Sequence, residues 1–178
     1  MNWTSITILA AALAGASPVT AQKADPFSGE LKQLYDHIKN DLTRMADKMA
    51  EADYSFKPAP ETRTFSQIIA HLADTQVRTC STLNGAPKSP NAASKTAKGE
   101  LVAALKESFS MCDQAFDSLT DATALETFML PQGQHHSKAA LMIAVISHAN
   151  EEYGYMAVYL RLKGIVPPSS ERPESARH

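Results

Sequence analysis

The sequence lacks any strong excess of charge of one sign, and it is poor in cysteine and tryptophan. Its formal net charge is -2, and it contains 2 cysteines and 1 tryptophan. The basic residues are scattered along the chain, so the clustered positive charge of a nucleic-acid-binding protein is missing. Beyond the N-terminal segment, no apolar stretch approaches the ~18 residues of a transmembrane helix. We therefore predict neither a nucleic-acid partner nor stable insertion into a membrane.

The first residues of the chain also lack charged side chains, because the first one is Lys23. The apolar run Ile6–Ala16 is too short to cross a bilayer as a helix but suits the hydrophobic part of a signal peptide. Small residues at Val19 and Ala21 fit the pattern for cleavage after Ala21. We predict that residues 1–21 are a signal peptide and that the protein is exported, to the periplasm or out of the cell.

The remaining chain has a comfortable size for one domain with a single core, which we place at residues 22–168. It holds both cysteines, Cys80 and Cys112. After export these thiols would meet an oxidising environment, so a disulfide between them is one interpretation. Two buried thiols that pack as small apolar side chains are the other. The sequence alone leaves both interpretations open.

Apolar residues recur at helical spacing in four segments, which predicts an all-α fold in the form of a small helical bundle. Thr64 and Gln67 form a capping box at the start of the second segment, and Gly164 followed by two prolines ends the last. The predicted helices span residues 25–50, 64–83, 99–119 and 137–163.

Between the helices the sequence predicts irregular connections. Two prolines follow Tyr54 and Phe56, so this segment should be extended, with both aromatic rings closing one end of the bundle. Residues 84–98 are rich in glycine, proline and small polar residues and are expected to form a mobile loop. A short extended piece is compatible with residues 127–130, and the polar tail 169–178 is expected to be disordered.

The candidate site comes from the second and fourth helices. His71 shares the apolar face of the second helix with Ile68, Leu72 and Thr75. His148 and Glu152 share a face of the last helix that begins apolar and includes Leu141, Val145, Tyr155 and Tyr159. Burial of three ionisable groups is costly unless they are paired, hydrogen-bonded or bound to a metal.

His148 and Glu152 stand four residues apart, so their side chains can reach the same ion, and His71 would complete the site from the neighbouring helix. Two imidazoles and one carboxylate leave coordination positions open, as in catalytic zinc and non-haem iron sites. Glu151 is an alternative ligand, but its register turns it partly away. The spacing alone also fits a simple hydrogen bond within a helix.

The other histidines are expected to be at the surface. His37 lies away from the apolar stripe of the first helix, among polar neighbours. His135 and His136 lie in or beside the turn that precedes the last helix. We predict no ligand role for these three side chains.

Two parts of the sequence resemble the DinB-like family. Residues 148–155, His-Ala-Asn-Glu-Glu-Tyr-Gly-Tyr, with 159–170, are similar to its C-terminal signature. Residues 53–65 and then 69–74, Ile-Ala-His-Leu-Ala-Asp, are similar to its central signature. The resemblance covers essentially all of the chain after residue 21, and it implies a four-helix bundle with an up-down-down-up connection.

Many members of this family bind a divalent metal through three histidines. The first two correspond to His71 and His148, and at the third position this sequence has Glu152. A carboxylate can bind Zn²⁺, Ni²⁺, Fe²⁺ or Mn²⁺, so the site can persist with a harder character. The other interpretation is that the metal site has been lost and that Glu152 only hydrogen-bonds a histidine.

Related enzymes are metal-dependent transferases and isomerases that use low-molecular-weight thiols, but export would separate this protein from the cytosolic thiol pool. Our leading hypothesis is a metal-binding protein with hydrolase or transferase activity on a small-molecule substrate, with Tyr155 as a candidate substrate-binding residue. The alternative is a non-catalytic binding or stress-related protein whose metal site has degenerated. Homodimerisation, common among small bundles, stays open.

Overall fold

The structure is a computed structural model that describes residues 25–130 and 133–171. The predicted signal peptide and its cleavage site lie outside these residues and remain predictions. The described chain is mostly helical, with four helices long enough to span the bundle, which confirms the predicted all-α class. They are α1 (Pro26–Lys48), α2 (Phe65–Leu83), α3 (Lys98–Asp117) and α4 (Lys138–Leu162).

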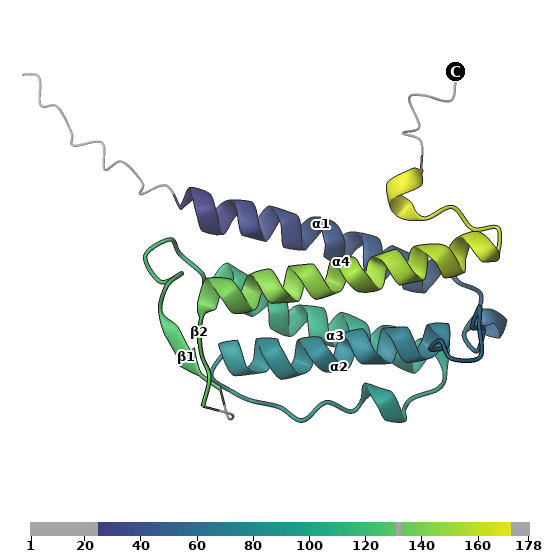
Figure 1. Cartoon of the computed structure of the whole chain (residues 1–178), viewed down its shortest axis with the longest axis horizontal. Helices are drawn as coiled ribbons and strands as arrows, with labels where there is room; N and C mark the ends of the chain where they lie inside the picture. The colour runs from purple at the N-terminus through teal and green to yellow at the C-terminus, as the bar shows by residue number, and fades with distance from the viewer. Residues whose placement is uncertain (1–24, 131–132, 172–178) are drawn as a thin grey trace, which may run out of the picture.

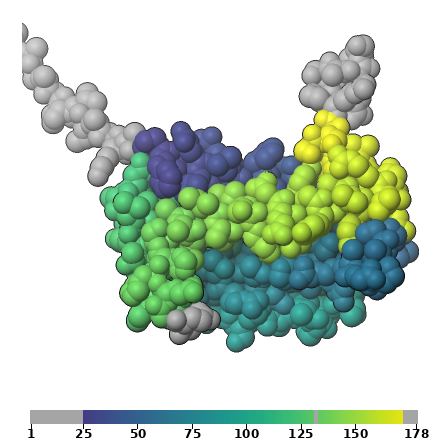
Figure 2. Space-filling view, viewed as in Figure 1, coloured from purple at the N-terminus to yellow at the C-terminus, as the bar shows by residue number. Residues whose placement is uncertain are grey.

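The helices α1 and α4 run in one direction, and α2 and α3 run in the other (Figure 1). The connection between α2 and α3 therefore runs back along the length of the bundle, and the up-down-down-up arrangement is confirmed. Helix α4 crosses one face of the molecule between α1 and α2 (Figure 2). Within the described residues, no helix is both long enough and apolar enough to cross a membrane.

The start of α2 is fixed by the predicted capping box. The Thr64 hydroxyl accepts a hydrogen bond from the Gln67 amide at 3.2 Å, and the Gln67 side chain accepts one from the Thr64 amide at 2.9 Å. Tyr54 is buried and its ring packs edge-on against Phe65, while Phe56 packs against Tyr159. Both rings close this end of the bundle, as the sequence predicted.

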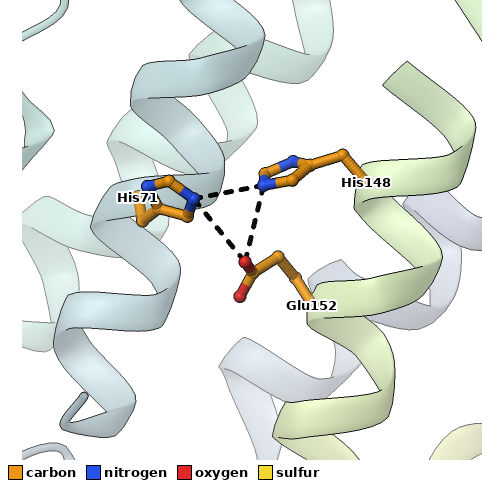
Figure 3. A group of neighbouring side chains, drawn as sticks. All are labelled: His71, His148 and Glu152. Carbon is orange, nitrogen blue, oxygen red and sulfur yellow. Dashed lines mark hydrogen bonds and ion pairs between the residues drawn. The ribbon is translucent and has the colours of Figure 1, made fainter. Parts of the chain in front are cut away.

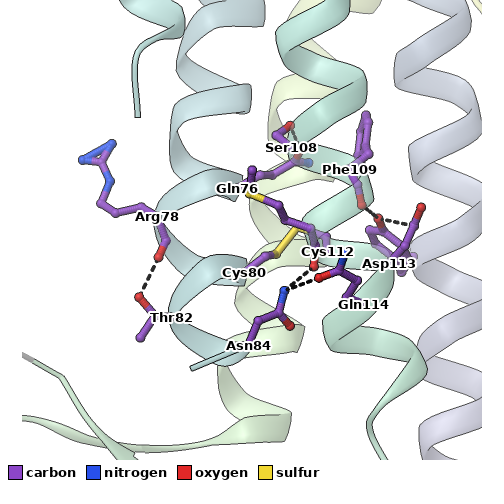
Figure 4. Close-up of a disulfide and its surroundings, with 12 residues drawn as sticks. Gln76, Arg78, Cys80, Thr82, Asn84, Ser108, Phe109, Cys112, Asp113 and Gln114 are labelled. Atoms are coloured by element: carbon purple, nitrogen blue, oxygen red, sulfur yellow. Dashed lines mark hydrogen bonds between the residues drawn. A yellow bond between two sulfur atoms is a disulfide. The ribbon is translucent and has the colours of Figure 1, made fainter. Parts of the chain in front are cut away.

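A disulfide joins α2 to α3. Cys80 and Cys112 are fully buried, and their Cα atoms are 4.9 Å apart, a normal separation for a disulfide (Figure 4). Gln76 stands four residues before Cys80 on α2. Its Oε1 atom accepts a hydrogen bond from the buried Ser108 hydroxyl of α3 at 2.7 Å. These two contacts, about one helical turn apart on α2, hold one of its faces against α3.

The connections are more ordered than the sequence suggested. In the loop expected to be mobile, the Ala92 and Ala93 amides donate to the buried carboxylate of Asp74, at 2.7 and 3.1 Å. The first residues of the tail expected to be disordered form a short helix, and Glu171 pairs with Arg44 and Lys48 of α1. The rest of that tail lies outside the described residues.

The predicted extended piece is half of a small hairpin. Strand β1 (Thr127–Met129) pairs antiparallel with β2 (His135–Ser137), with Phe128 opposite His136. Strand β2 leads directly into α4, whose first turn is capped when the Ser137 hydroxyl accepts a hydrogen bond from the Ala140 amide at 3.2 Å. The hairpin thus sets the point at which α4 begins.

Candidate metal centre

Three side chains meet between α2 and α4. His71 comes from the second turn of α2, and His148 and Glu152 stand one turn apart on α4 (Figure 3). Because the two helices lie side by side and run antiparallel, the imidazole of α2 faces both side chains of α4. The three residues predicted from the sequence are therefore brought together.

The ligand atoms of this cluster are close to one another. His71 Nε2 lies 3.1 Å from His148 Nε2 and 3.6 Å from Glu152 Oε1. His148 Nε2 lies 3.4 Å from the same carboxylate oxygen. No other group of three or more metal-ligating side chains comes together in residues 25–130 and 133–171.

These separations fit a metal ion. Two ligands bound to Zn²⁺ at about 2.0 to 2.1 Å stand about 3.3 Å apart when the coordination is tetrahedral. The three measured separations, 3.1, 3.4 and 3.6 Å, bracket that value. A point about 2.0 Å from all three atoms therefore exists without any movement of the side chains.

The carboxylate of Glu152 is the buried member of the cluster. Its side chain is 2% exposed, against 35% for His71 and 23% for His148. In the described part of the chain, Glu152 Oε2 is buried without a hydrogen-bond partner. A buried carboxylate oxygen without a partner is costly, so the cluster as it stands is incompletely satisfied.

The charges around the cluster favour a neutral imidazole at His71. Burial lowers the pKa of His71 from its ordinary value of 6.5, and the positive charge of Arg63 lowers this pKa further. Glu152 acts in the opposite direction but has the smaller effect. A neutral imidazole is the form that binds metal ions, so His71 is kept in the required state near neutral pH.

The buried face of α4 differs from the predicted one by about one position. Met142, Ala149 and Met156 are buried on its central line. His148 and Tyr155, which we expected on the inner face, stand at its edge. The segment 141–146 is apolar all round, so its periodicity could not fix the buried face.

Tyr155 does not point into the bundle. Its side chain is 46% exposed, and its hydroxyl donates to Glu151 Oε1 at 3.1 Å. Glu151 is itself exposed and takes no part in the metal-ligating cluster. The expectation that Tyr155 shares the inner face is therefore wrong, although the ring lines the cleft described next.

A cleft opens near the cluster, and sequence analysis did not identify it; its lining does not include His71, His148 or Glu152. It has a volume of about 530 Å³ and lies between segment 58–63, the first turn of α2 and α4. The residues on its walls include Pro58, Glu61, Arg63, Ile68, Tyr155 and Val158. Arg63, whose guanidinium Nη1 lies 4.0 Å from Glu152 Oε1, connects this cleft to the cluster.

Arg63 could have been noticed in the sequence because it immediately precedes the capping box of the helix that carries His71. The other histidines of the described chain lie apart from the cluster. His37 is 76% exposed and lies 3.7 Å from Asp41, and His135 is exposed on β2. His136 is half-buried in the hairpin.

Comparison with known proteins identifies relatives of the whole bundle. The sequence model of the DinB superfamily matches residues 33–156. Three solved structures are similar: a DinB-like protein from Bacillus cereus (TM-score 0.67, 17% identity, 79% of this chain and 95% of that chain), a DinB-like protein from Bacillus subtilis (0.61, 19%, 79% and 99%) and a conserved protein from Enterococcus faecalis (0.62, 15%, 76% and 96%). No curated protein sequence matches this chain.

Proposed function

Because this chain belongs to the DinB superfamily, and because three ligand side chains converge in its bundle, we propose that it binds one divalent metal ion through His71, His148 and Glu152. The solved relatives are too distant in sequence to support more than the fold. The assignment of the metal therefore rests on the side chains of this chain.

The observation that carries the proposal is the buried carboxylate of Glu152 between two imidazoles. Its Oε1 atom lies 3.4 and 3.6 Å from the two Nε2 atoms, while Oε2 is buried without a partner in the described chain. A divalent cation would offset the negative charge and draw the three ligand atoms into one coordination sphere.

The ligand set favours an ion that accepts both nitrogen and oxygen. Two imidazoles with one carboxylate suit Zn²⁺, Fe²⁺, Ni²⁺ or Mn²⁺, and they leave coordination positions for water or a substrate atom. A metal in such a site would lower the pKa of a bound water, and the resulting hydroxide is a nucleophile suited to hydrolysis. Glu152 would lower the net charge of the site and hold the two imidazoles at a fixed spacing.

The activity that follows most simply is metal-dependent hydrolysis of a small molecule, with group transfer as the related reaction. His71 and His148 are partly exposed, so solvent reaches the cluster. The cleft beside it, with a volume of about 530 Å³, lies within the size range of small-molecule sites. Tyr155 on its wall would contact a substrate rather than the metal.

We also propose that the protein acts after export, in the periplasm or outside the cell. The apolar segment Ile6–Ala16 and the small residues before Gln22 support this. The disulfide between Cys80 and Cys112 agrees with an oxidising compartment. Such a location makes chemistry on the cytosolic thiol pool a poor candidate for the reaction.

Metal analysis of the purified protein tests the proposal. Wild type should carry one Zn²⁺, Mn²⁺, Fe²⁺ or Ni²⁺ per chain or take it up on titration, and His71→Ala should not. His135→Ala removes an exposed histidine outside the cluster and should behave as wild type. If wild type and His71→Ala both purify without metal and neither takes up any of the four ions, the proposal fails.

A second candidate is a non-catalytic bundle whose polar residues satisfy one another. The 3.1 Å contact between the two Nε2 atoms supports it, because two neutral imidazoles can share one hydrogen bond. The substitution Glu152→His distinguishes the two candidates. If it creates metal affinity that wild type lacks, the pocket is intact but the natural site has degenerated, which favours this second candidate.

A further inference from the structure

The cleft near the cluster has an apolar body, and its charged lining residues are one cation, Arg63, and two exposed carboxylates, Glu61 and Glu151. The apolar surface comes from Pro58, from Ile68 of α2 and from Val158 and Tyr159 of α4. Arg63 is the single cation among the lining residues. A ligand that matched this cleft would have an apolar part and one anionic group.

The position of the Arg63 main chain is fixed by its neighbours. The buried Tyr159 hydroxyl donates to the Arg63 carbonyl at 2.6 Å, and the next residue, Thr64, caps α2. The Arg63 side chain is 52% exposed, and its Nη1 atom lies 4.0 Å from Glu152 Oε1. The cation therefore stands between the cleft and the proposed metal site.

Metal binding at the proposed site would change the charge around Arg63. Among the described residues, the structure gives the Arg63 guanidinium one ion pair, with Glu152. A divalent cation on Glu152 would claim that carboxylate and leave a net positive charge beside the guanidinium. The two other carboxylates that line the cleft, Glu61 and Glu151, are exposed to solvent, and Glu151 already accepts a hydrogen bond from the Tyr155 hydroxyl.

We propose that the metal-loaded protein binds small organic carboxylates in this cleft, with the anionic group held by Arg63 and the apolar part lying on Ile68, Val158 and Tyr159. This inference rests on the proposed metal site. It assigns the substrate class of the site, a carboxylate with an apolar body, and it makes Arg63 the residue that determines specificity. A guanidinium suits this role because its donors match the two oxygens of a carboxylate.

The test uses benzoate as the probe carboxylate and benzamide as its neutral analogue. The protein is loaded with Co²⁺, whose visible absorption reports on loading, and binding is measured by calorimetry. Wild type should bind benzoate and should bind benzamide at least tenfold more weakly. Arg63→Met should load with Co²⁺ as wild type does but lose about tenfold in benzoate affinity, the order expected for one partly exposed charge-assisted hydrogen bond.

Arg78→Met is the matched control, because Arg78 is an exposed arginine of α2 that does not line the cleft. Its benzoate affinity should stay within twofold of wild type. The inference is overturned if wild type and Arg63→Met bind benzoate equally well, or if benzamide binds as tightly as benzoate. Loss of Co²⁺ loading in Arg63→Met would overturn it as well. Absence of Co²⁺ uptake by wild type would instead count against the metal site itself.

Discussion

The two faces of helix α2 differ in how they are held. The face toward α3 carries the buried disulfide of Cys80 and the hydrogen bond between Gln76 and Ser108. The face toward α4 carries His71, which meets a buried carboxylate and a half-exposed imidazole. One interface is closed by a covalent bond, and the other contains ionisable groups beside an open cleft.

On helix α2, one interface therefore contributes mainly to stability, and the other carries the candidate metal centre. A site of polar side chains needs supports that keep its geometry when its own interactions are unfavourable. The contacts of α2 with α3 supply such a support, because they fix the helix that presents His71. The interface with α4 is then free to hold groups that a purely structural interface would exclude.

The largest expected effect comes from breaking the covalent interface. The double substitution Cys80→Ala with Cys112→Ala should lower the free energy of unfolding by about 3 to 4 kcal/mol, because 32 residues separate the two cysteines. Urea denaturation measures the loss, and wild type in reductant is the control. If the folded double variant also lost its affinity for metal, the two faces would not be independent.

Metal binding should have the next largest effect, on the other face. A ligand at about 100 times its Kd stabilises the folded state by about 2.7 kcal/mol when it does not bind the unfolded chain. Wild type with saturating Zn²⁺ should show a gain of this order in thermal or urea unfolding, and His71→Ala should show none. An equal gain in both proteins would place the ion elsewhere.

The substitution Glu152→Gln should act in opposite directions with and without metal. It removes a buried charge whose Oε2 has no partner in the described chain, so the metal-free protein should gain about 1 kcal/mol of stability. The same variant should lose the stabilisation by Zn²⁺. Urea curves in chelator and in Zn²⁺ measure both effects, and destabilisation in chelator would show that Glu152 is already satisfied.

The smallest effect concerns pH. The pKa of His71 is lowered below 6.5, so the folded metal-free protein binds fewer protons at this group than the unfolded chain does. Its contribution to stability is present above pH 6.5 and is lost as the pH falls toward the lowered pKa. In chelator, His71→Gln should lose less stability than wild type between pH 7.5 and 5.5, and His135→Gln should match wild type.

The sequence predicted more of the fold than of the site's surroundings. The four helices, the capping box at Thr64 and the aromatic closure by Tyr54 follow from local patterns and appear in the structure. The three side chains of the candidate metal centre were also predicted from spacing and resemblance, and the structure brings them together. The buried face of α4 lies about one position from the predicted one, because segment 141–146 is apolar all round and carries no periodic signal for its buried side.

By itself, the sequence determined the helices and the residues able to bind a metal, since helical periodicity and ligand chemistry are properties of short segments. Only the tertiary structure decided that His71 meets Glu152, that Arg63 stands beside them and that Tyr155 faces outward. These facts depend on how α2 and α4 are rotated and on where segment 58–63 crosses the end of the bundle. Packing of the whole core sets those positions, and no local pattern encodes them.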